Sequence, residues 1–271
     1  MFLSIVVVCW NAGAKLKMMV DSILSQTCRD YEVVVEDSES GDGSVEALPR
    51  DPRIRVFREK DKGIYDGMNR AVKRCRGEFI YFLNCGDTFF AENTLELVKR
   101  AVEESGYDGS RPLIAYGDIY ERLTGQVAQA NPVMDDFACF RNVPNHQACF
   151  YSSDLLGERA FDLKYRVRAD YEHFLFCKYT AGTGFLYLGF PTADYEGGGF
   201  SESAENREIA DREHREITGK YLPAGKLFLY RAYLVLTLQP LRFKLANDAR
   251  TAAFYDRVKS AVYRRRTKQD S

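Results

Sequence analysis

The chain has 271 residues, of which 45% are hydrophobic and 28% are charged, so it can bury the core of one large domain or two small ones. Its 38 Lys and Arg against 39 Asp and Glu give a formal charge of −1, which argues against binding nucleic acid through overall charge. No run reaches the roughly 18 apolar residues of a bilayer-spanning helix, and the first residues lack the features of a secretory signal. We therefore expect a cytoplasmic protein.

The sequence pattern of residues 1 to about 90 predicts short strands that alternate with helices. Residues 3–9 (LSIVVVC) form a continuous apolar run, typical of a strand covered on both faces. The next segments are predicted as a helix at 15–24, strands at 31–36 and 54–57, a helix at 63–74, a strand at 78–83 and a helix from a cap at Asn93 to about Glu104. This order is typical of a βαβ parallel sheet.

Beyond residue 110 the pattern is less regular. We predict strands at 113–120 and 185–190, helices at 170–179 and 203–221, and an irregular segment at 133–154. Three consecutive glycines, followed by Phe200 and Ser201, have little backbone restriction and indicate a hinge or a lid.

The charge is distributed unevenly. Residues 220–271 carry twelve Lys and Arg against three Asp, a net charge of +9, which leaves −10 on residues 1–219. We therefore divide the chain at this point and expect residues 220–271 to form a basic amphipathic helical extension. Its mixture of basic residues and apolar clusters suits an anionic membrane surface, and helical pairing with a second subunit in a homodimer explains the apolar clusters equally well.

Polar residues follow three predicted strands at the point where each strand ends. They are Trp10 to Gly13, Glu36 to Ser44, and Asn84 to Asp87. In open parallel sheets ligands bind at this edge, yet neither the dinucleotide fingerprint nor the P-loop is present. Carboxylates that face a phosphorylated ligand need a divalent cation between them. The sequence therefore predicts phosphate chemistry through Mn²⁺ or Mg²⁺.

Each motif taken alone has a plain structural interpretation. Residues 37–44 could form a polar turn with a helix cap at Asp42 or Ser44, residues 84–87 a β-turn, and Asp170 an ordinary acid at a helix start. The three histidines accompany no G-x-S-x-G nucleophile motif, and the seven scattered cysteines have no zinc spacing. The joint order of the motifs favours a ligand site.

Four segments appear in one order: SIVVVCWNAG, VVVEDSESGDGS, EKDKGIYDGMNRAV and GEFIYFLNCGDTF. Together they resemble a family 2 glycosyltransferase of the type that builds bacterial capsular polysaccharide, exopolysaccharide or O-antigen. The resemblance is close over residues 1 to about 90, weaker over 140–205 and absent beyond 220.

The resemblance implies an α/β protein with the GT-A fold, in which helices flank a mostly parallel central sheet and a C-terminal helical extension follows. Residues 1–219 would be the catalytic domain, with 1–110 as the nucleotide-sugar-binding half and 111–219 as the acceptor half. The implied reaction is transfer of a hexose, with inversion, from a nucleotide-diphosphate sugar, UDP by analogy, to a growing lipid-linked glycan. The enzyme would lie in the cytoplasm, in peripheral contact with the inner face of the cell membrane.

By position, the resemblance assigns most donor contacts to the first half of the chain. Asp37 would bond the nucleobase, Asp87 would hold Mn²⁺ or Mg²⁺ against the diphosphate, and the other nucleotide-sugar-binding residues would be Asn11, Asp61, Tyr65, Asp66, Asn69 and Asn84. The chain departs from many relatives in having Asn84, Cys85 and Gly86 before Asp87, and in having Met68 in place of an arginine. Lys62 or Arg70 would have to replace that arginine.

The resemblance assigns the acceptor side to the second half. Asp170 in RVRADYEHF matches the general base, a type of group that contributes about 10²- to 10⁴-fold to rate, although Ala169 replaces the preceding glutamate. His146 in PNHQACFY matches a histidine near the acceptor or the metal, and its alternative is a buried histidine bonded to backbone. Gly198, Gly199 and Ser201 would belong to a lid that excludes water.

Two other functions remain open at this point. A sugar-phosphate nucleotidyltransferase also combines an α/β sheet, a metal and a sugar phosphate, but it would need a glycine-rich, basic segment after the first strand, and residues 10–15 (WNAGAK) do not provide one. A non-catalytic glycan- or nucleotide-binding scaffold on the same fold is favoured by the small number of carboxylates in residues 84–87.

Overall fold

The chain divides into two compact units, residues 1–221 and 222–271. The computed structural model describes all residues except 158, 198–203 and 238–271, so the expected lid residues Gly198, Gly199 and Ser201 and most of the tail lie outside the described part. In its described part the second unit contains helix α8 (Ala224–Leu236). Within the described ranges, no helix combines the length and apolarity needed to cross a membrane.

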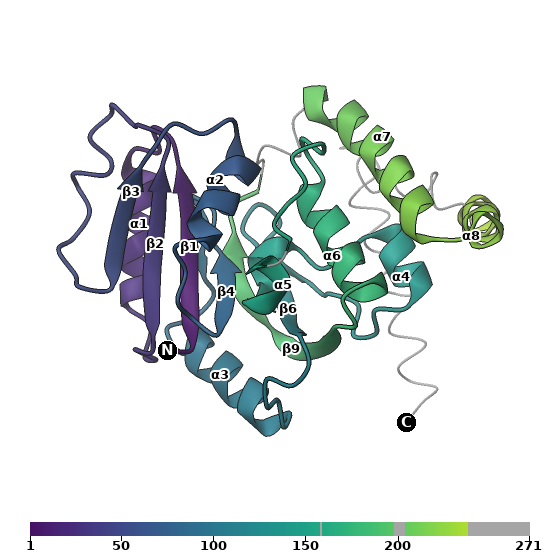
Figure 1. Cartoon of the computed structure of the whole chain (residues 1–271), viewed down its shortest axis with the longest axis horizontal. Helices are drawn as coiled ribbons and strands as arrows, with labels where there is room; N and C mark the ends of the chain where they lie inside the picture. The colour runs from purple at the N-terminus through teal and green to yellow at the C-terminus, as the bar shows by residue number, and fades with distance from the viewer. Residues whose placement is uncertain (158, 198–203, 238–271) are drawn as a thin grey trace. The chain divides into compact units, whose positions relative to one another are not determined.

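A nine-stranded sheet forms the centre of the first unit (Figure 1). Its order is β3-β2-β1-β4-β8-β6-β9-β5, with β7 paired to β6. The strands are β1 (Leu3–Cys9), β2 (Tyr31–Asp37), β3 (Ile54–Arg58), β4 (Phe79–Phe82), β5 (Thr88–Phe89), β6 (Leu113–Glu121), β7 (Gln126–Ala128), β8 (Cys149–Ser152) and β9 (Gly184–Tyr195). The β3-β2-β1-β4 half is parallel, whereas β8 pairs antiparallel with both β4 and β6.

Helices cover both faces of this sheet. They are α1 (Ala14–Leu24), α2 (Ile64–Val72), α3 (Thr94–Glu104), α4 (Asp136–Arg141), the 3₁₀ turn η1 (His146–Ala148), α5 (Asp154–Gly157), α6 (Ala169–Tyr179) and α7 (Ala204–Tyr221). Successive residues of a strand point to opposite faces. In β1, Ile5 and Val7 pack in one core with α1 and α3, whereas Val6 packs in a second core with α2 and α6.

The alternation of strands and helices is interrupted between β2 and β3. Strands alternating with helices were expected over residues 1 to about 90, but residues 38–53 contain only turns and bends, so the expectation is wrong here. The Asp42 carboxylate accepts the Ser44 N–H at 3.0 Å and the Gly13 N–H at 2.8 Å. Asp42 therefore closes a turn and ties it to the end of β1 instead of capping a helix.

The segment expected to be irregular, residues 133–154, is structured. It forms α4, η1 and β8, and β8 completes the sheet between β4 and β6. Local side-chain caps start two of these short elements: Asp135 accepts the Ala138 N–H at 2.7 Å, and Asn145 accepts the Gln147 N–H at 3.0 Å. Asn93, in contrast, occupies the cap position of α3 but makes no side-chain cap bond.

Candidate functional site

Two neighbouring cavities lie at the carboxyl ends of the parallel strands. The larger has a volume of about 690 Å³ and the smaller about 560 Å³. Val8, near the end of β1, and Ile64, at the start of α2, line both cavities. The two spaces therefore adjoin at these two residues.

The small cavity is formed by the segments that follow β1, β2 and β3. Trp10 lines it with an exposed fraction of 70%, so the indole is available to a ligand at the rim. Asp61 lines it as well, and this loop is fixed because the Asp61 N–H donates to Ser38 Oγ at 3.1 Å and the Gly63 N–H donates to Asp61 Oδ1 at 2.9 Å. Lys60 adds the positive charge of this lining.

Asp37 and Asn11 lie next to the small cavity but do not line it. Asp37 is fully buried, and its carboxylate accepts the Ser40 hydroxyl and N–H and pairs with Arg58 Nε at 3.0 Å. Asn11 has a positive φ of 48° and accepts the Gly41 N–H at 2.9 Å. The structure therefore places both residues where they fasten the loop after β2 to the end of β1.

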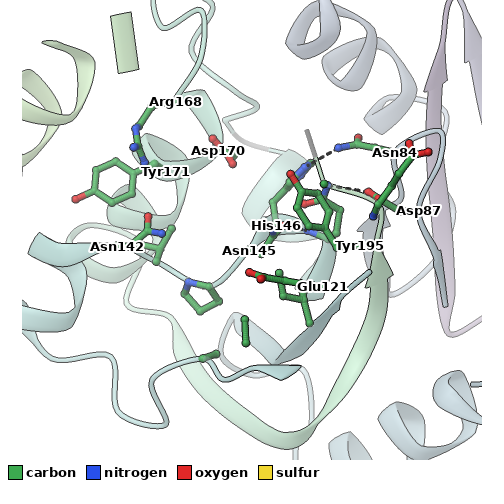
Figure 2. A pocket seen from close by; sticks show the side chains of 18 of the residues that line it. Asn84, Asp87, Glu121, Asn142, Asn145, His146, Arg168, Asp170, Tyr171 and Tyr195 are labelled. Atoms are coloured by element: carbon green, nitrogen blue, oxygen red, sulfur yellow. Dashed lines mark hydrogen bonds between the residues drawn. The ribbon is translucent and has the colours of Figure 1, made fainter. Parts of the chain in front are cut away.

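Asn84 and Asp87 lie at one end of the large cavity (Figure 2). Asp87 is 3% exposed, and its two carboxylate oxygens accept the Gln147 side-chain amide and the Glu196 N–H, each at 2.9 Å. Burial raises the pKa of Asp87 to about 6, although both hydrogen bonds oppose the shift. The Asn84 amide nitrogen lies 3.1 Å from His146 Nε2.

Glycine is required at position 86 by the local backbone conformation and by the nearby Glu196 side chain. The φ of Gly86, 106°, is a conformation that other residues rarely adopt, and a Cβ at this position would lie 2.2 Å from Glu196 Oε2. Glu196 thus occupies the space beside the turn, where its carboxylate pairs with Lys15 at 2.6 Å. A second carboxylate, from the residue that follows β9, therefore lies beside the turn that carries Asp87.

The capacity of these residues to hold a divalent cation rests on Asp87. Among the described residues, no group of three His, Cys, Asp or Glu side chains could hold a metal. Each oxygen of the Asp87 carboxylate accepts one protein hydrogen bond and retains further lone-pair capacity. Mg²⁺ commonly takes only one or two carboxylates from a protein and the remaining ligands from phosphates and water. The residues fit a cation that Asp87 holds jointly with a diphosphate.

His146 lines the large cavity from the 3₁₀ turn η1. Its Nε2 faces Asn84, and its Nδ1 is buried with no hydrogen-bond partner. Burial lowers the pKa of His146, with an opposing effect from Asp170, which favours the neutral imidazole. This geometry differs from the alternative of a histidine satisfied by backbone groups.

Asp170 and Tyr65 form a second polar group in the same cavity, on the first turns of α6 and α2. The Tyr65 hydroxyl lies 2.8 Å from Asp170 Oδ1 and 2.9 Å from the Val167 carbonyl oxygen. Burial and the nearby Asp170 raise the pKa of Tyr65 well above its ordinary value, so the phenol remains a hydrogen-bond donor. One carboxylate oxygen of Asp170 is thereby held, and the carboxylate lines the cavity.

Glu213 of α7 holds the segment that leads into α6. Its carboxylate accepts the N–H groups of Arg166, Val167 and Arg168 at 2.7, 3.0 and 2.9 Å. Glu213 is 6% exposed, so these bonds lie in a largely dry environment. Because Asp170 follows two residues after Arg168, we infer that this anchor sets the position of the carboxylate.

Two further residues expected at the donor site do not reach either cavity. The Asn69 side chain bonds both the N–H and the carbonyl oxygen of Phe161 at 2.8 Å. Asp66 accepts the Lys62 N–H at 2.9 Å and pairs with Arg70 at 3.2 Å. The basic side chains of Lys62 and Arg70, considered as replacements for an arginine at position 68, also lie outside the cavity linings.

Sequence reasoning missed several residues that line the cavities or support them. These are Lys60 at the small cavity, Arg168, Gln147 and Glu196 at the large cavity, and Glu213 on α7. Trp10, in contrast, was among the residues expected at a strand end, although it was not assigned to the donor. The missed residues come from elements whose pairing with the site is set only by the tertiary fold.

One protein-family model matches more than half of the chain. The model of "Glycosyl transferase family 2" matches residues 4–162. The PGL/p-HBAD biosynthesis glycosyltransferases of Mycobacterium bovis and Mycobacterium tuberculosis are 32% identical over 216 residues, which cover 77% of this chain and 82% of theirs.

Solved structures support the fold. The first 349 residues of S. aureus TarS superpose with a TM-score of 0.60 at 17% identity, over 82% of this chain and 71% of theirs. The mannosyltransferase PcManGT from Pyrobaculum calidifontis, solved with GDP-Man and Mn²⁺, gives the same TM-score and identity over 96% of this chain and 79% of its own. The GT-A fold expected from the sequence is confirmed.

Proposed function

The chain belongs to glycosyl transferase family 2, and from this we propose that it transfers a hexose from a UDP-sugar, with inversion, to a growing lipid-linked glycan of the cell surface. One observation carries the proposal. The Asp170 carboxylate and the Asp87 carboxylate line the same cavity, and this cavity shares a wall with a second one that suits a nucleoside. In this proposal the general base, the diphosphate and the nucleoside would occupy adjoining spaces.

The donor would extend across both cavities. The nucleoside fits the small cavity, where the exposed Trp10 offers an aromatic face to the base and Asp61 offers a hydrogen-bond acceptor. The diphosphate would then lie past Val8 toward Asn84 and Asp87. TarS has been solved with UDP and with UDP-GlcNAc, and PcManGT with GDP-Man. These neighbours support a nucleotide sugar, and UDP is our choice among the nucleotides.

Asp87 would hold Mn²⁺ or Mg²⁺ together with the diphosphate. Such a cation neutralises the charge that develops on the leaving diphosphate. The chain's own contribution is orientation, because the Gln147 amide and the Glu196 N–H fix both oxygens of the Asp87 carboxylate. Burial of this carboxylate also disfavours its charge in the free protein, so a cation at this point relieves an unfavourable state.

Asp170 would act as the general base. An acceptor hydroxyl gives its proton to the Asp170 carboxylate while its oxygen forms the new bond to the anomeric carbon. The bond from that carbon to the diphosphate breaks, and the nucleoside diphosphate leaves with the electron pair, so a single displacement inverts the configuration. Tyr65 would hold one oxygen of Asp170 and leave the other for the acceptor. His146, with its unpaired Nδ1, would contact the sugar or the acceptor.

The second unit would place the enzyme at the inner face of the cell membrane. Helix α8 exposes large apolar side chains, with exposed fractions of 72% at Phe228, 63% at Leu229, 65% at Val235 and 81% at Leu236. The chain from residue 220 onward carries a net charge of +9, which suits an anionic lipid surface. Sedimentation with phosphatidylglycerol vesicles, compared with phosphatidylcholine vesicles, tests this contact, and a concentration-dependent mass in solution would indicate a homodimer instead.

A thermal-shift panel of UDP, GDP, CDP and dTDP, each with and without Mn²⁺, tests the donor site. A ligand at a hundred times its Kd adds about 2.7 kcal/mol to the free energy of unfolding. We expect stabilisation by UDP that increases with Mn²⁺. The Mn²⁺ increment should be lost in Asp87→Asn and retained in Asp21→Asn, a matched change on the exposed face of α1. If none of the four nucleotides stabilises the chain, the scaffold alternative replaces this proposal.

A further inference from the structure

Arg168 lies in the wall of the large cavity without a charged partner. Among the described residues that line this cavity, it is the one Lys or Arg. No carboxylate in the described part of the chain forms an ion pair with it, and its Nε is buried without a hydrogen-bond partner. Its guanidinium lies 5.7 Å from the centre of the Tyr171 ring. A guanidinium donor is thus held in the wall and is left unsatisfied by the protein.

An unsatisfied buried guanidinium N–H is energetically costly, because its lost hydration is not replaced. The planar guanidinium offers a fork of donors that matches a carboxylate or a phosphate. The backbone at Arg168 is fixed by the bond of its N–H to Glu213 at 2.9 Å, so the side chain starts from a held position. These features are those of a preorganised anion site.

The position of Arg168 separates this site from the diphosphate end. Figure 2 shows Arg168 and Tyr171 on the side of the cavity opposite to Asn84 and Asp87, with Asp170 between them. A diphosphate held at Asp87 therefore leaves the Arg168 end free. The group next to Asp170 on that side is the acceptor, since Asp170 is the proposed base.

We propose that Arg168 binds an anionic group, a carboxylate or a phosphate, on the acceptor glycan. This inference rests on the proposed function, because it assumes that a sugar acceptor enters beside Asp170. The uncharged Asn142, which lines the same end, would add a neutral hydrogen bond. The acceptor class is thus an acidic or phosphorylated glycan rather than a neutral one.

Binding to the full chain, saturated with UDP and Mn²⁺, tests the inference. The probes are methyl glucoside as the neutral sugar, methyl glucuronide as the carboxylate and methyl glucoside 6-phosphate as the phosphate, each also in the galactose series. Ligand-observed NMR gives their dissociation constants. Loss of a hydrogen bond to a charged group corresponds to about a tenfold to hundredfold change, so we expect an anionic glycoside to bind tighter than its neutral counterpart by that factor. The glycoside that binds more tightly shows whether the anionic group of the acceptor is a carboxylate or a phosphate.

Three variants separate a local contact from a change in net charge. Arg168→Gln should abolish the preference for the anionic glycoside, and Arg168→Lys should retain part of it. Arg141→Gln makes the same change at an exposed side chain near the end of α4, outside the cavity lining, and should retain the preference in full. Circular dichroism spectra confirm that each variant is folded.

Several outcomes would overturn the inference. They are equal or undetectable binding of the charged and neutral glycosides, a loss of preference in Arg141→Gln as large as in Arg168→Gln, or weaker binding of UDP by Arg168→Gln, which would assign the residue to the diphosphate. If UDP with Mn²⁺ does not bind the native chain, the proposed function fails and this inference fails with it. If UDP binds and no anion preference is seen, only the anion site fails.

Discussion

Glu213 offers a test of how the fold positions the proposed base. Its carboxylate accepts three backbone N–H groups from residues 166–168. In Glu213→Gln one oxygen becomes an NH₂ group. A glutamine oxygen at the Oε2 position can still accept the hydrogen bonds of the Val167 and Arg168 N–H groups, but the side-chain NH₂ then faces the Arg166 N–H. One charge-assisted hydrogen bond is lost and two donors oppose each other, which destabilises the fold by about 2 to 3 kcal/mol.

The same substitution should reduce turnover more than nucleotide binding. Asp170 lies in the first turn of α6, two residues after the anchored segment, and a displacement of about 1 Å of a catalytic group can reduce the rate by about 10²-fold. Trp10 and Asp87 belong to other elements, so the Kd of UDP should remain unchanged. Urea unfolding gives the stability, and release of UDP from UDP-sugars gives kcat and KM.

Glu216→Gln is the matched control on the same helix. Glu216 is solvent-exposed and bonds Lys164 and Tyr165 at the surface, and exposed pairs of this kind contribute little to stability. The reasoning is refuted if Glu213→Gln and Glu216→Gln have the same stability. It is also refuted if Glu213→Gln loses stability while kcat stays at the native value.

Three other predictions concern single side chains. Trp10 is the one tryptophan of the sequence, so UDP should quench the protein's tryptophan fluorescence. Trp10→Ala should weaken the binding of UDP by about 1–3 kcal/mol, the contribution of base stacking. Unchanged fluorescence at saturating UDP would argue against stacking. Burial lowers the pKa of His173 to about 4, so protonation below pH 6.5 favours the unfolded chain, and about 2 to 3 kcal/mol of stability should be lost by pH 4.5; urea titrations at pH 7 and 4.5 should show a smaller loss in His173→Phe. Asn69→Ala breaks both hydrogen bonds to Phe161 and should lower the free energy of unfolding by about 2 kcal/mol without weakening the binding of UDP. If Asn69 contacts the sugar donor instead, the variant should bind UDP more weakly.

Local patterns predicted the elements of the first half well. The apolar run at 3–9 matches β1, and the helical spacing at 15–24 matches α1 within one residue. These signals are carried by neighbours in sequence and by burial on both faces of a parallel strand. The segment 133–154 carried weaker signals, because α4, η1 and β8 are short and depend on single caps such as Asp135 and Asn145.

The strand-end argument placed Asn84 and Asp87 at the large cavity, and the family resemblance placed Asp61 at the small one. Neither could tell which side chains point into the cavities. Asp37 is the last residue of β2, at the strand end as expected, yet Ser40 and Arg58 occupy its carboxylate. Glu213 carries no sequence signal, because its three partners lie more than 40 residues earlier. Such contacts exist only after α7 packs on the segment before α6.

The stereochemistry of donor hydrolysis tests the central claim most directly. The native chain with Mg²⁺, which unlike Mn²⁺ does not broaden proton signals, is mixed with the α-linked donors UDP-glucose, UDP-galactose and UDP-N-acetylglucosamine, and proton NMR follows the anomer released to water before mutarotation. The account predicts that the β-hexose appears first from one of these donors. In Asp170→Asn the release rate should fall by about 10²- to 10⁴-fold while the Kd of UDP is retained, and Asp162→Asn, outside both cavities, should release the sugar at the native rate. Release of the α-hexose first, or a native rate in Asp170→Asn, would contradict the account.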